Sequence, residues 1–398
     1  MRPSRSGMAR VRKGRVRGRR GGRTLGMVLS GGGARGAFQV GVYERLLEDK
    51  RFADGPTVLS GVSAGAINAA LIAAGRSPAA MMEFWNGIAD DPPVTASSKF
   101  FHTASRTLLR LTAEEVARWA LPHRTLLPFL RRMRNHVPPR RGSLIALWVE
   151  YLLTSRFELV SRLLDGVREG FVADTSRLRQ RLVDTFGGEV VPSNGHCLAI
   201  NTVDAHTGHV VRYVTKATPL TRPPDYILVK EITVDMVLAS CSIPLLFPPV
   251  QIGERWLWDG GMLVNTPLAP VVALGADEIV TVLVTEPPDL APGPFDRFGR
   301  AVERTVDSLL ENAYNVDRKL LLERNRLAQI RGTGYRAVTL YEAVRPAREG
   351  RFNAGSYLYF ERKVLAGMHA IGRNAAHSWL AAGPRIDQLE GLASGAAA

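Results

Sequence analysis

The sequence predicts a three-layer α/β/α fold with a mainly parallel central sheet and an inserted helical cap. Two short apolar runs, residues 24–30 and 57–63, each predict a buried strand, and helical patterns follow at 37–50 and 64–75. This repeated strand–helix order is typical of a parallel sheet covered by helices. Between residues 90 and 170 the pattern changes to amphipathic helices broken by prolines, which indicates the cap.

The same patterns divide the chain into four parts. Residues 1–23 form a basic tail that we expect to be disordered. Residues 24–89 and 171–290 supply the core of the fold, and the cap at 90–170 is inserted between them. Residues 291–398 are predicted to be a C-terminal helical extension packed on the core.

Further elements are expected in the second half of the chain. A turn at Thr207-Gly208 separates two strand patterns, and four prolines mark a linker after residue 286. We predict strands at 197–205, 210–215 and 277–285, a long amphipathic helix at roughly 296–328, and a final helix from about 355 to 381.

The net charge of +15 is unevenly distributed along the chain. Residues 1–24 hold ten Lys/Arg and no acid, and residues 90–190 hold sixteen bases against eleven acids. Two explanations of this excess stay open. It results from an arginine-rich composition, or the basic segments contact an anionic membrane surface. Nucleic acid is a less favoured partner, because no recognition motif accompanies the charge. The oligomeric state does not follow from the sequence.

The composition excludes several other classes of protein. Only two cysteines occur, Cys197 and Cys241, so we expect no disulfide framework and no clustered metal signature. We also expect no cofactor. No run of eighteen apolar residues exists, which predicts that no helix spans a bilayer. The basic tail is not followed by an apolar segment of signal length, so we expect a cytoplasmic protein, peripheral at the inner membrane surface.

The pentapeptide GVSAG, residues 61–65, places Ser63 where a predicted strand gives way to a helix. A serine on such a sharp turn exposes its hydroxyl above the sheet, beside a helix N-terminus whose dipole favours developing negative charge. Side chains at the flanking positions would clash, which accounts for Gly61 and Gly65. The pentapeptide alone is a weak signal, but its position in the pattern predicts that Ser63 is a nucleophile.

A second glycine-rich turn follows the first predicted strand. Gly31, Gly33 and Gly36 have the spacing of a dinucleotide-binding loop. In the alternative interpretation, the N–H groups of Gly31, Gly32 and Gly33 face the oxyanion of a reacting ester, and the helix that starts near Arg35 adds its dipole.

One requirement separates these two interpretations. A dinucleotide site needs an acidic residue at the end of the second strand, where it binds a ribose hydroxyl. The second strand of this chain ends in Ser63, and Asp54 precedes that strand. The oxyanion interpretation is therefore favoured.

No histidine has the context expected of a catalytic base. A hydrolase with a nucleophile elbow usually places its histidine on a loop after the last strands. His369 and His377 come late enough in the chain, but both lie in a helical pattern. The other six lie in the cap or in loops and turns: His102, His123, His136, His196, His206 and His209.

One carboxylate is a candidate for the base. Asp259 follows the apolar run Trp256–Trp258 and precedes Gly260 and Gly261. An Asp-Gly pair often makes only a hairpin turn. A carboxylate at a strand end among apolar neighbours is also where a raised pKa and a base role arise, so both interpretations stay open at this point.

Taken together, these residues resemble the patatin-like phospholipase family. The resemblance rests on four segments in the family's order, SGGGARGAFQVGVYERL, SGVSAGAINAALIAAG, LASCSIPLLFPPVQIGERWLWDGGMLVNTPL and LGADEIVTVLV. They cover roughly residues 25–90 and 190–285. The cap and the part after residue 290 carry no segment that matches the family.

The resemblance implies a Ser–Asp dyad without metal. Ser63 would attack the acyl carbonyl, and Asp259 would accept its proton and return it to the leaving alcohol. The N–H groups of the three loop glycines would hold the oxyanion. Arg35, with Gly36, would support the loop, either by orienting it or by contacting a lipid phosphate.

The function predicted from the sequence is therefore a serine hydrolase that cleaves carboxylic esters of phospholipids or lysophospholipids. One alternative is a general carboxylesterase that acts on other esters. A second alternative is a non-catalytic lipid-binding scaffold, which is less favoured because nucleophile, base and loop occur together.

Overall fold

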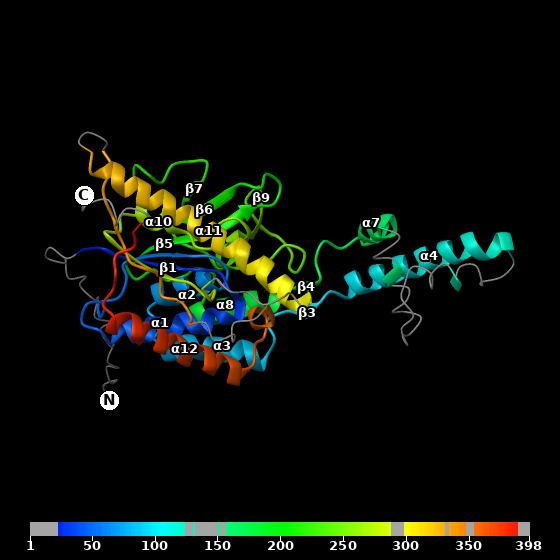
Figure 1. Cartoon of the computed structure of the whole chain (residues 1–398), viewed down its shortest axis with the longest axis horizontal. Helices are drawn as coiled ribbons and strands as arrows, with labels where there is room; N and C mark the ends of the chain where they lie inside the picture. The colour runs from blue at the N-terminus through cyan, green and yellow to red at the C-terminus, as the bar shows by residue number, and fades with distance from the viewer. Residues whose placement is uncertain are drawn as a thin grey trace, which may run out of the picture.

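The computed structural model describes residues 23–123, 130–131, 150–151, 157–287, 298–330, 334–347 and 354–388. Within these ranges a central sheet lies between two layers of helices, and a helical arm extends from one end of this body (Figure 1). The basic tail predicted at 1–23 lies outside the described residues, apart from Arg23, and so does much of the predicted cap.

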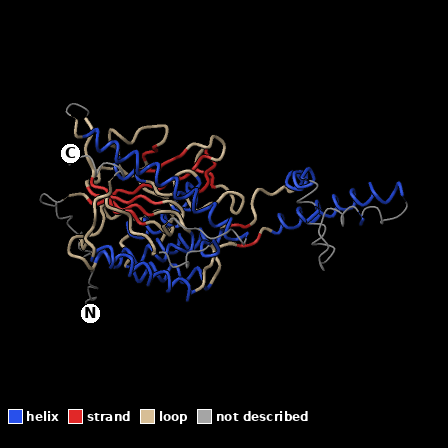
Figure 2. The backbone as a smooth tube through the Cα atoms, viewed as in Figure 1, coloured by secondary structure: helices blue, strands red, loops and turns tan. Residues whose placement is uncertain are grey.

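The strands of the central sheet are β1 Leu25–Leu29, β2 Val58–Gly61, β5 Cys197–Asp204, β6 Val210–Val214, β7 Tyr226–Leu228, β8 Val250–Ile252, β9 Arg255–Asp259, β10 Glu278–Val282 and β11 Thr339–Leu340. Their order is β11-β10-β1-β2-β5-β6-β7. Figure 2 draws these strands in red, with helices in blue on both sides. From β11 to β5 every pairing is parallel, whereas β6 and β9 are antiparallel to β5. The predicted α/β fold with a mainly parallel sheet is therefore confirmed.

The central strands β1 and β2 are buried along their whole length because helices cover both faces of the sheet. In β1, Met27 and Leu29 belong to the core on one face and Val28 to the core on the other. In β2, Leu59 belongs to the same core as Met27 and Leu29, and Val58 belongs to the same core as Val28. All five of these side chains are almost fully buried.

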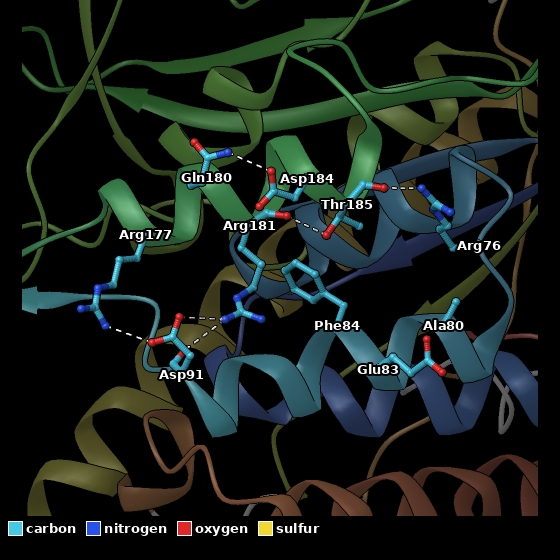
Figure 3. Close-up of a pocket in the computed structure, with 10 residues that line it drawn as sticks. All are labelled: Arg76, Ala80, Glu83, Phe84, Asp91, Arg177, Gln180, Arg181, Asp184 and Thr185. Atoms are coloured by element: carbon cyan, nitrogen blue, oxygen red, sulfur yellow. Dashed lines mark hydrogen bonds and ion pairs between the residues drawn. The ribbon is translucent and has the colours of Figure 1, made fainter.

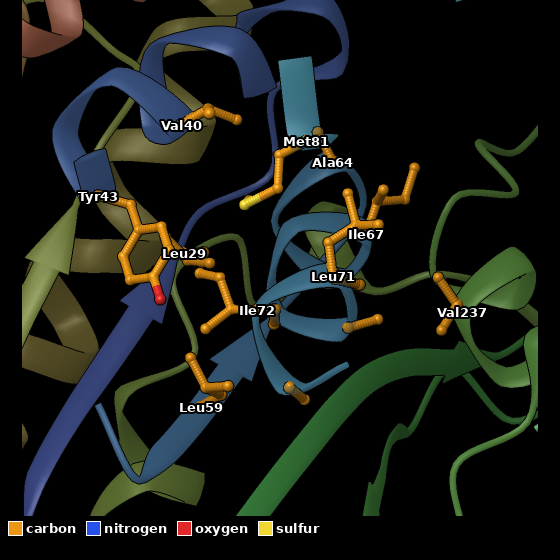
Figure 4. Packing of buried hydrophobic residues seen from close by; sticks show 14 of the residues in the cluster. Leu29, Val40, Tyr43, Leu59, Ala64, Ile67, Leu71, Ile72, Met81 and Val237 are labelled. Atoms are coloured by element: carbon orange, nitrogen blue, oxygen red, sulfur yellow. The ribbon is translucent and has the colours of Figure 1, made fainter. Parts of the chain in front are cut away.

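The helices form two layers. One face is covered by α1 Gly36–Leu47, α2 Ala64–Ala73, α3 Pro78–Asp90, α8 Ser176–Phe186, α9 Val234–Ala239 and α12 Arg362–Ala381, and the other by α10 Leu268–Ala273 and α11 Phe298–Ala328. In Figure 4, Leu29 and Leu59 of the strands lie near Ile72 of α2, with Met81 of α3 packed nearby. Each fully buried leucine of this kind stabilises the fold by roughly 1.5–3 kcal/mol.

The C-terminal helix α12 packs closely along α1 because each helix offers a glycine at the contact. A Cβ atom on Gly41 of α1 would lie 2.0 Å from the carbonyl oxygen of His369. A Cβ atom on Gly372 of α12 would lie 2.1 Å from the carbonyl oxygen of Phe38. This reciprocal contact fixes the end of the chain against the helix that follows the first strand.

The described part of the predicted cap forms an arm. The antiparallel strands β3 Thr95–Ala96 and β4 Ala173–Asp174 make its base, and α4 Ser98–His123 and α7 Phe157–Gly166 extend away from the sheet (Figure 1). A separate small cluster of Leu111, Tyr151 and Leu159 holds the arm together. Within the described ranges, no helix has both the length and the apolar character needed to cross a bilayer.

Candidate active site

Ser63 occupies a strained turn between β2 and α2. Its φ and ψ are 54° and −128°, a conformation that costs a non-glycine residue on the order of 1–3 kcal/mol. A hydrogen bond stabilises the turn: the N–H of Ser63 donates to Oγ of Ser240 over 3.0 Å. The same Oγ donates to the carbonyl oxygen of Asn201 over 2.6 Å.

The two glycines of the pentapeptide occupy positions without room for a side chain. A Cβ atom on Gly61 would lie 2.2 Å from the carbonyl oxygen of Gly65. A Cβ atom on Gly65 would lie 2.1 Å from the carbonyl oxygen of Leu29 in the neighbouring strand. The tight turn that presents Ser63 therefore depends on close backbone contact across both positions.

The sheet brings Asp259 to Ser63 because two strands share one edge of β5. The parallel strand β2 ends at Gly61, opposite Ile200 of β5. The antiparallel strand β9 arrives from the other direction and ends at Asp259, opposite Thr202. The other edge of β5 is paired with β6 over the same residues, so β2 and β9 must lie on one edge. Because they run in opposite directions, their C-terminal ends face each other.

Asn201 lies between these two pairing positions and joins the strand ends. Its Nδ2 donates to the carbonyl oxygen of Gly61 over 2.8 Å and to Oγ of Ser60 over 3.1 Å. On the other side, a Cβ atom on Gly260 would lie 2.7 Å from the carbonyl oxygen of Asn201. The turn after Asp259 is thereby packed directly against β5, the strand that pairs with β2.

The carboxyl group of Asp259 is buried and easily protonated. Burial raises its pKa to about 7, although the N–H of Gly261 and the hydroxyl of Ser63 donate hydrogen bonds that act in the opposite direction. The N–H of Gly261 lies 2.7 Å from Oδ1 of Asp259. A carboxyl group with a pKa near neutral pH, beside a serine hydroxyl, suits a general base.

The three glycines of the loop have different surroundings. Gly31 lies beside the nucleophile, since a Cβ atom on it would be 3.2 Å from Cβ of Ser63. The N–H of Gly31 donates to the carbonyl oxygen of Asn265 over 3.1 Å. Among the described residues, the N–H groups of Gly32 and Gly33 have no acceptor. Two donors rather than three are thus available to a ligand at this loop.

Arg35 is completely buried behind the loop. Its Nε donates to Oγ of Ser356 over 2.9 Å, and its Nη1 donates to the carbonyl oxygen of Val284 over 3.0 Å. The guanidinium carbon lies 3.6 Å from the ring centre of Tyr357. These contacts match loop support, whereas the complete burial of Arg35 leaves no surface for a lipid phosphate.

Gly36, the last glycine of the loop, is pressed against an aromatic ring. A Cβ atom on Gly36 would lie 2.3 Å from the indole of Trp85. Nε1 of that indole donates to Oδ1 of Asn68 over 3.0 Å, and Nδ2 of Asn68 donates to the carbonyl oxygen of Gly36 over 2.9 Å. Helices α2 and α3 therefore fix the start of α1.

An apolar cavity of about 230 Å³ begins at Ser63 and Gly33. Helices α2, α3 and α8, the base of the arm, the loop after α9 and residues near 360 contribute its walls. Its other lining residues are Ala64, Ile67, Trp85, Ile88, Pro93, Val94, Val172, Ala173, Leu178, Cys241, Ile243, Leu246, Phe247, Leu358 and Phe360. None of the described residues that line this cavity has a charged side chain, so it suits a hydrocarbon chain.

A larger hollow of about 600 Å³ lies between α3 and α8 (Figure 3). Asp91 pairs there with both Arg177 and Arg181. Arg76 donates to the carbonyl oxygen of Thr185. With Glu83 and Asp184 also present, three acids balance three arginines in the lining. Because this hollow contains no residue of the predicted site, the apolar cavity is the better candidate for the active site.

The histidines with described side chains lie elsewhere. His369 pairs with Glu44 over 2.9 Å on the outer helices, and His377 lies 3.5 Å from Arg45. None of the described histidine side chains hydrogen-bonds to Ser63 or Asp259. In the described ranges, no cluster of three His, Cys, Asp or Glu side chains is placed to hold a metal ion.

Sequence reasoning missed three residues that support the site, namely Asn201, Ser240 and Asn265. All three are at most 3% exposed. Asn201 and Ser240 are polar residues that directly follow apolar runs, in CLAINTVD and VLASCS, and this is the signal that could have identified them. Their roles depend on contacts between distant segments, which the pattern does not contain.

The mainly parallel sheet and the serine on a strained strand-to-helix turn define an α/β protein of the nucleophile-elbow type. A family model described as patatin-like phospholipase matches residues 27–272. This is more than half of the chain, which therefore belongs to the patatin-like phospholipase family. Membership supports lipid ester hydrolase activity. No curated protein matches the chain.

Three solved structures are among those similar to this chain. VipD from Legionella pneumophila is 14% identical, with a TM-score of 0.38, over 92% of this chain and 68% of that one. The type III effector ExoU of Pseudomonas aeruginosa is 17% identical, with a TM-score of 0.34, over 91% and 53%. Human GIVD cytosolic phospholipase A2 is 11% identical, with a TM-score of 0.40, over 90% and 58%. This chain thus spans little more than half of the last two, and such distant similarities carry no argument about activity.

Proposed function

We propose that this chain is a serine lipid acyl hydrolase that cleaves carboxylic ester bonds of phospholipids or lysophospholipids. One observation carries the proposal: a buried Asp259, with a pKa raised to about 7, faces Ser63 at the end of an apolar cavity. The reaction forms an acyl-enzyme on Ser63, which water then hydrolyses. The family supports the class of reaction, and the dyad is our assignment.

The first step transfers a proton from Ser63 to Asp259. As Oγ of Ser63 attacks the ester carbonyl carbon, the Asp259 carboxylate accepts the hydroxyl proton. A base whose pKa lies near the working pH is deprotonated in a large fraction of molecules and still returns the proton readily. The protonated Asp259 then donates to the leaving alcohol, and the ester C–O bond breaks.

The loop stabilises the negative charge that develops on the carbonyl oxygen. The N–H groups of Gly32 and Gly33 are the donors without an acceptor in the described chain, and Gly33 lines the cavity beside Ser63. Preorganised donors of this kind lower the barrier, each by about 3–4 kcal/mol. The N–H of Gly31 has a structural task instead, because it joins the loop to Asn265.

The cavity accommodates the acyl chain during both half-reactions. Its walls remove the chain from water and hold the ester carbonyl above Ser63. In the second half-reaction Asp259 accepts a proton from water, which attacks the acyl-enzyme, and Ser63 recovers its proton from Asp259. The free fatty acid is released.

A general carboxylesterase is the second candidate, and one observation favours it. No cationic side chain lines the cavity, so nothing described there selects a phosphate-bearing alcohol. Esters without a phosphate would meet the same nucleophile and the same apolar walls. Phospholipid and simple ester substrates therefore need to be compared directly.

We further propose that the arm contacts an anionic membrane surface. Val94 and Val172, which adjoin the base of the arm, line the cavity, so the arm and the active site share a border. The side chains of Leu109 on α4 and Leu164 on α7 are 70% and 69% exposed. Binding to vesicles with anionic lipid that weakens at high salt is expected, and binding insensitive to both would contradict this part of the proposal.

The proposal is tested by fatty-acid release from a diacyl phospholipid, a lysophospholipid and a short-chain nitrophenyl ester. Ser63→Ala should reduce kcat by about 10⁴-fold or more on every ester that the wild type cleaves. Asp259→Asn should reduce it by about 10³-fold. Hydrolysis of the simple ester alone would favour the general carboxylesterase.

Asp204→Asn is the matched control. Asp204 is also a buried carboxylate, 5% exposed, but it caps the turn after β5 and has a lowered pKa. Its variant should keep wild-type activity. A fluorophosphonate probe should label wild-type protein and not Ser63→Ala. Labelling that persists in Ser63→Ala would remove Ser63 as the nucleophile, and full activity of Asp259→Asn would remove the dyad.

A further inference from the structure

A short segment near the C-terminus, residues 356–360, passes over the active site. We refer to it as the strap. Its first two residues are the last two of the 3₁₀ turn Ala354–Tyr357, and it precedes α12. The strap lies well beyond residue 272, where the match to the family model ends. It is therefore a feature of this chain that the family assignment does not describe.

The first part of the strap is fixed to the glycine loop. Ser356 and Tyr357 contact the buried Arg35 through the hydrogen bond and the ring contact described above. The hydroxyl of Tyr357 donates to Oδ1 of Asp307 over 2.8 Å, which joins the strap to α11. A Cβ atom on Gly33 would lie 2.0 Å from the carbonyl oxygen of Tyr357, so the two backbones are in direct contact.

The second part of the strap forms a wall of the cavity. Leu358 and Phe360 line it, while Tyr359 between them does not and is 55% exposed. Leu358 is 54% exposed and lies at the solvent side of the wall. Phe360 stacks on Trp85, with ring centres 6.4 Å apart and planes 6° apart. Because Trp85 is almost fully buried whereas Leu358 is exposed, we refer to this stacked pair as the inner wall of the cavity.

We propose that Phe360 determines the length of acyl chain that the enzyme accepts. The cavity volume of about 230 Å³ is below the roughly 300 Å³ at which sites for drug-sized ligands begin. We infer that short and medium acyl chains fit inside, whereas longer chains meet the Trp85–Phe360 pair. This inference rests on the proposed function, in which Ser63 attacks an ester whose acyl chain occupies the cavity.

The test compares kcat/KM for nitrophenyl esters with acyl chains of about 4 to 16 carbons. Phe360→Ala removes part of the inner wall, and it should raise the ratio of long-chain to short-chain kcat/KM by about tenfold or more. Phe360→Trp enlarges the ring and should move the optimum to shorter chains. If Phe360→Ala does not fold, Phe360→Leu replaces it in the test. This variant should shift the preferred acyl chain to longer lengths by a smaller amount.

Tyr359→Ala is the matched control, because Tyr359 is the neighbouring aromatic residue of the strap and does not line the cavity. Its chain-length profile should equal that of the wild type. Profiles of all Phe360 variants that coincide with the wild-type profile would overturn the inference while leaving the hydrolase proposal intact.

A second measurement separates failure of this inference from failure of the proposed function. Titration calorimetry with fatty acids of increasing length measures occupancy of the cavity without turnover. If the wild type hydrolyses no ester, the proposed function fails. A shift of the preferred fatty acid to longer chains in Phe360→Ala would still support the role of the strap, and an unchanged preference would overturn it.

Discussion

Ser63 and Asp259 stand at the facing ends of two strands that share one edge of β5. Their strands pair with Ile200 and Thr202, so a single residue, Asn201, separates the two pairing positions. This arrangement positions the proposed nucleophile and the proposed base by backbone hydrogen bonds between strands instead of flexible loops. Rigid support of this kind keeps reacting groups in place and lowers the entropic part of the barrier.

The pH dependence of hydrolysis should follow Asp259. The base accepts a proton only when it is deprotonated, and its pKa is raised to about 7. We therefore expect kcat/KM on a soluble ester to rise about tenfold per pH unit below about 7 and to level off above it. A profile that is flat between about pH 5 and 8 would contradict this role, and Asp204→Asn should leave the inflection unchanged.

Replacing Asp259 by Asn should stabilise the protein at about pH 8. The pKa of this carboxyl is higher in the folded protein than the ordinary 3.8, so the folded state holds a proton that the unfolded chain has lost. The resulting stabilisation is present below about pH 4 and is lost as the pH rises to about 7. Above that pH the buried carboxylate costs about 4 kcal/mol.

Thermal melts of the wild type and of Asp259→Asn measure this effect. The variant should have the higher Tm at about pH 8, and the difference should shrink toward about pH 5 as the wild-type carboxyl becomes protonated. Asp204→Asn should show no such gain, because burial is outweighed by hydrogen bonds that lower the pKa of Asp204. A difference in Tm that does not change with pH would contradict the assignment of the raised pKa.

The elements near Ser63 were predictable because their signals are local. The turn that bears Ser63 needs Gly61 and Gly65 within five residues, and the strands on either side are short apolar runs. The partner of Ser63 was harder to predict. That Asp259 reaches it depends on β9 joining β5 from the opposite direction, and no local pattern specifies such a pairing between distant segments.

The start of the last helix was predicted wrongly for a physical reason. The sequence pattern predicts this helix from about residue 355. The structure begins it at Arg362. Residues 356–360 instead lie against the glycine loop, where they contact Arg35 and Trp85. Contacts with distant residues outweigh the local helical pattern in this segment.

Ser240→Ala should weaken both the turn and the reaction. The hydroxyl of Ser240 accepts the N–H of Ser63 and donates to Asn201, so its loss leaves two buried polar groups without partners. We expect a loss of about 2–4 kcal/mol in the free energy of unfolding and a lower kcat, measured by urea denaturation and initial rates. Ser242→Ala is the control, since that buried hydroxyl bonds only to the carbonyl oxygen of Leu238. Equal kcat values for the two variants would contradict the specific role of Ser240.

Gly65→Ala should lower the free energy of unfolding, because the steric clash costs more than the higher helix propensity of alanine contributes. The new Cβ would lie 2.1 Å from the carbonyl oxygen of Leu29, so the strand or the helix must move. We expect a loss of about 3 kcal/mol in urea denaturation. Gly367→Ala in α12 is the control, because its Cβ meets no atom within 4 Å, and a gain of about 0.5–1 kcal/mol is expected there. Similar unfolding midpoints for the two variants would contradict the packing argument.

Arg35→Lys should lower kcat while leaving KM for a soluble ester nearly unchanged. A lysine keeps the charge near Asp307 but loses the fork that bonds Ser356 and Val284, so the donors of Gly32 and Gly33 are held less firmly. We expect kcat to fall about 10–100-fold.

Arg373→Lys is the matched control for this change. Arg373 is a surface arginine of α12 that pairs with Glu44 and Glu48, and its variant should behave as the wild type. Arg35→Lys could instead raise KM for phospholipid while leaving turnover of a soluble ester unchanged. That result would show that Arg35 binds the phosphate. Its burial argues against that outcome, because a phosphate would have to displace the strap to reach it.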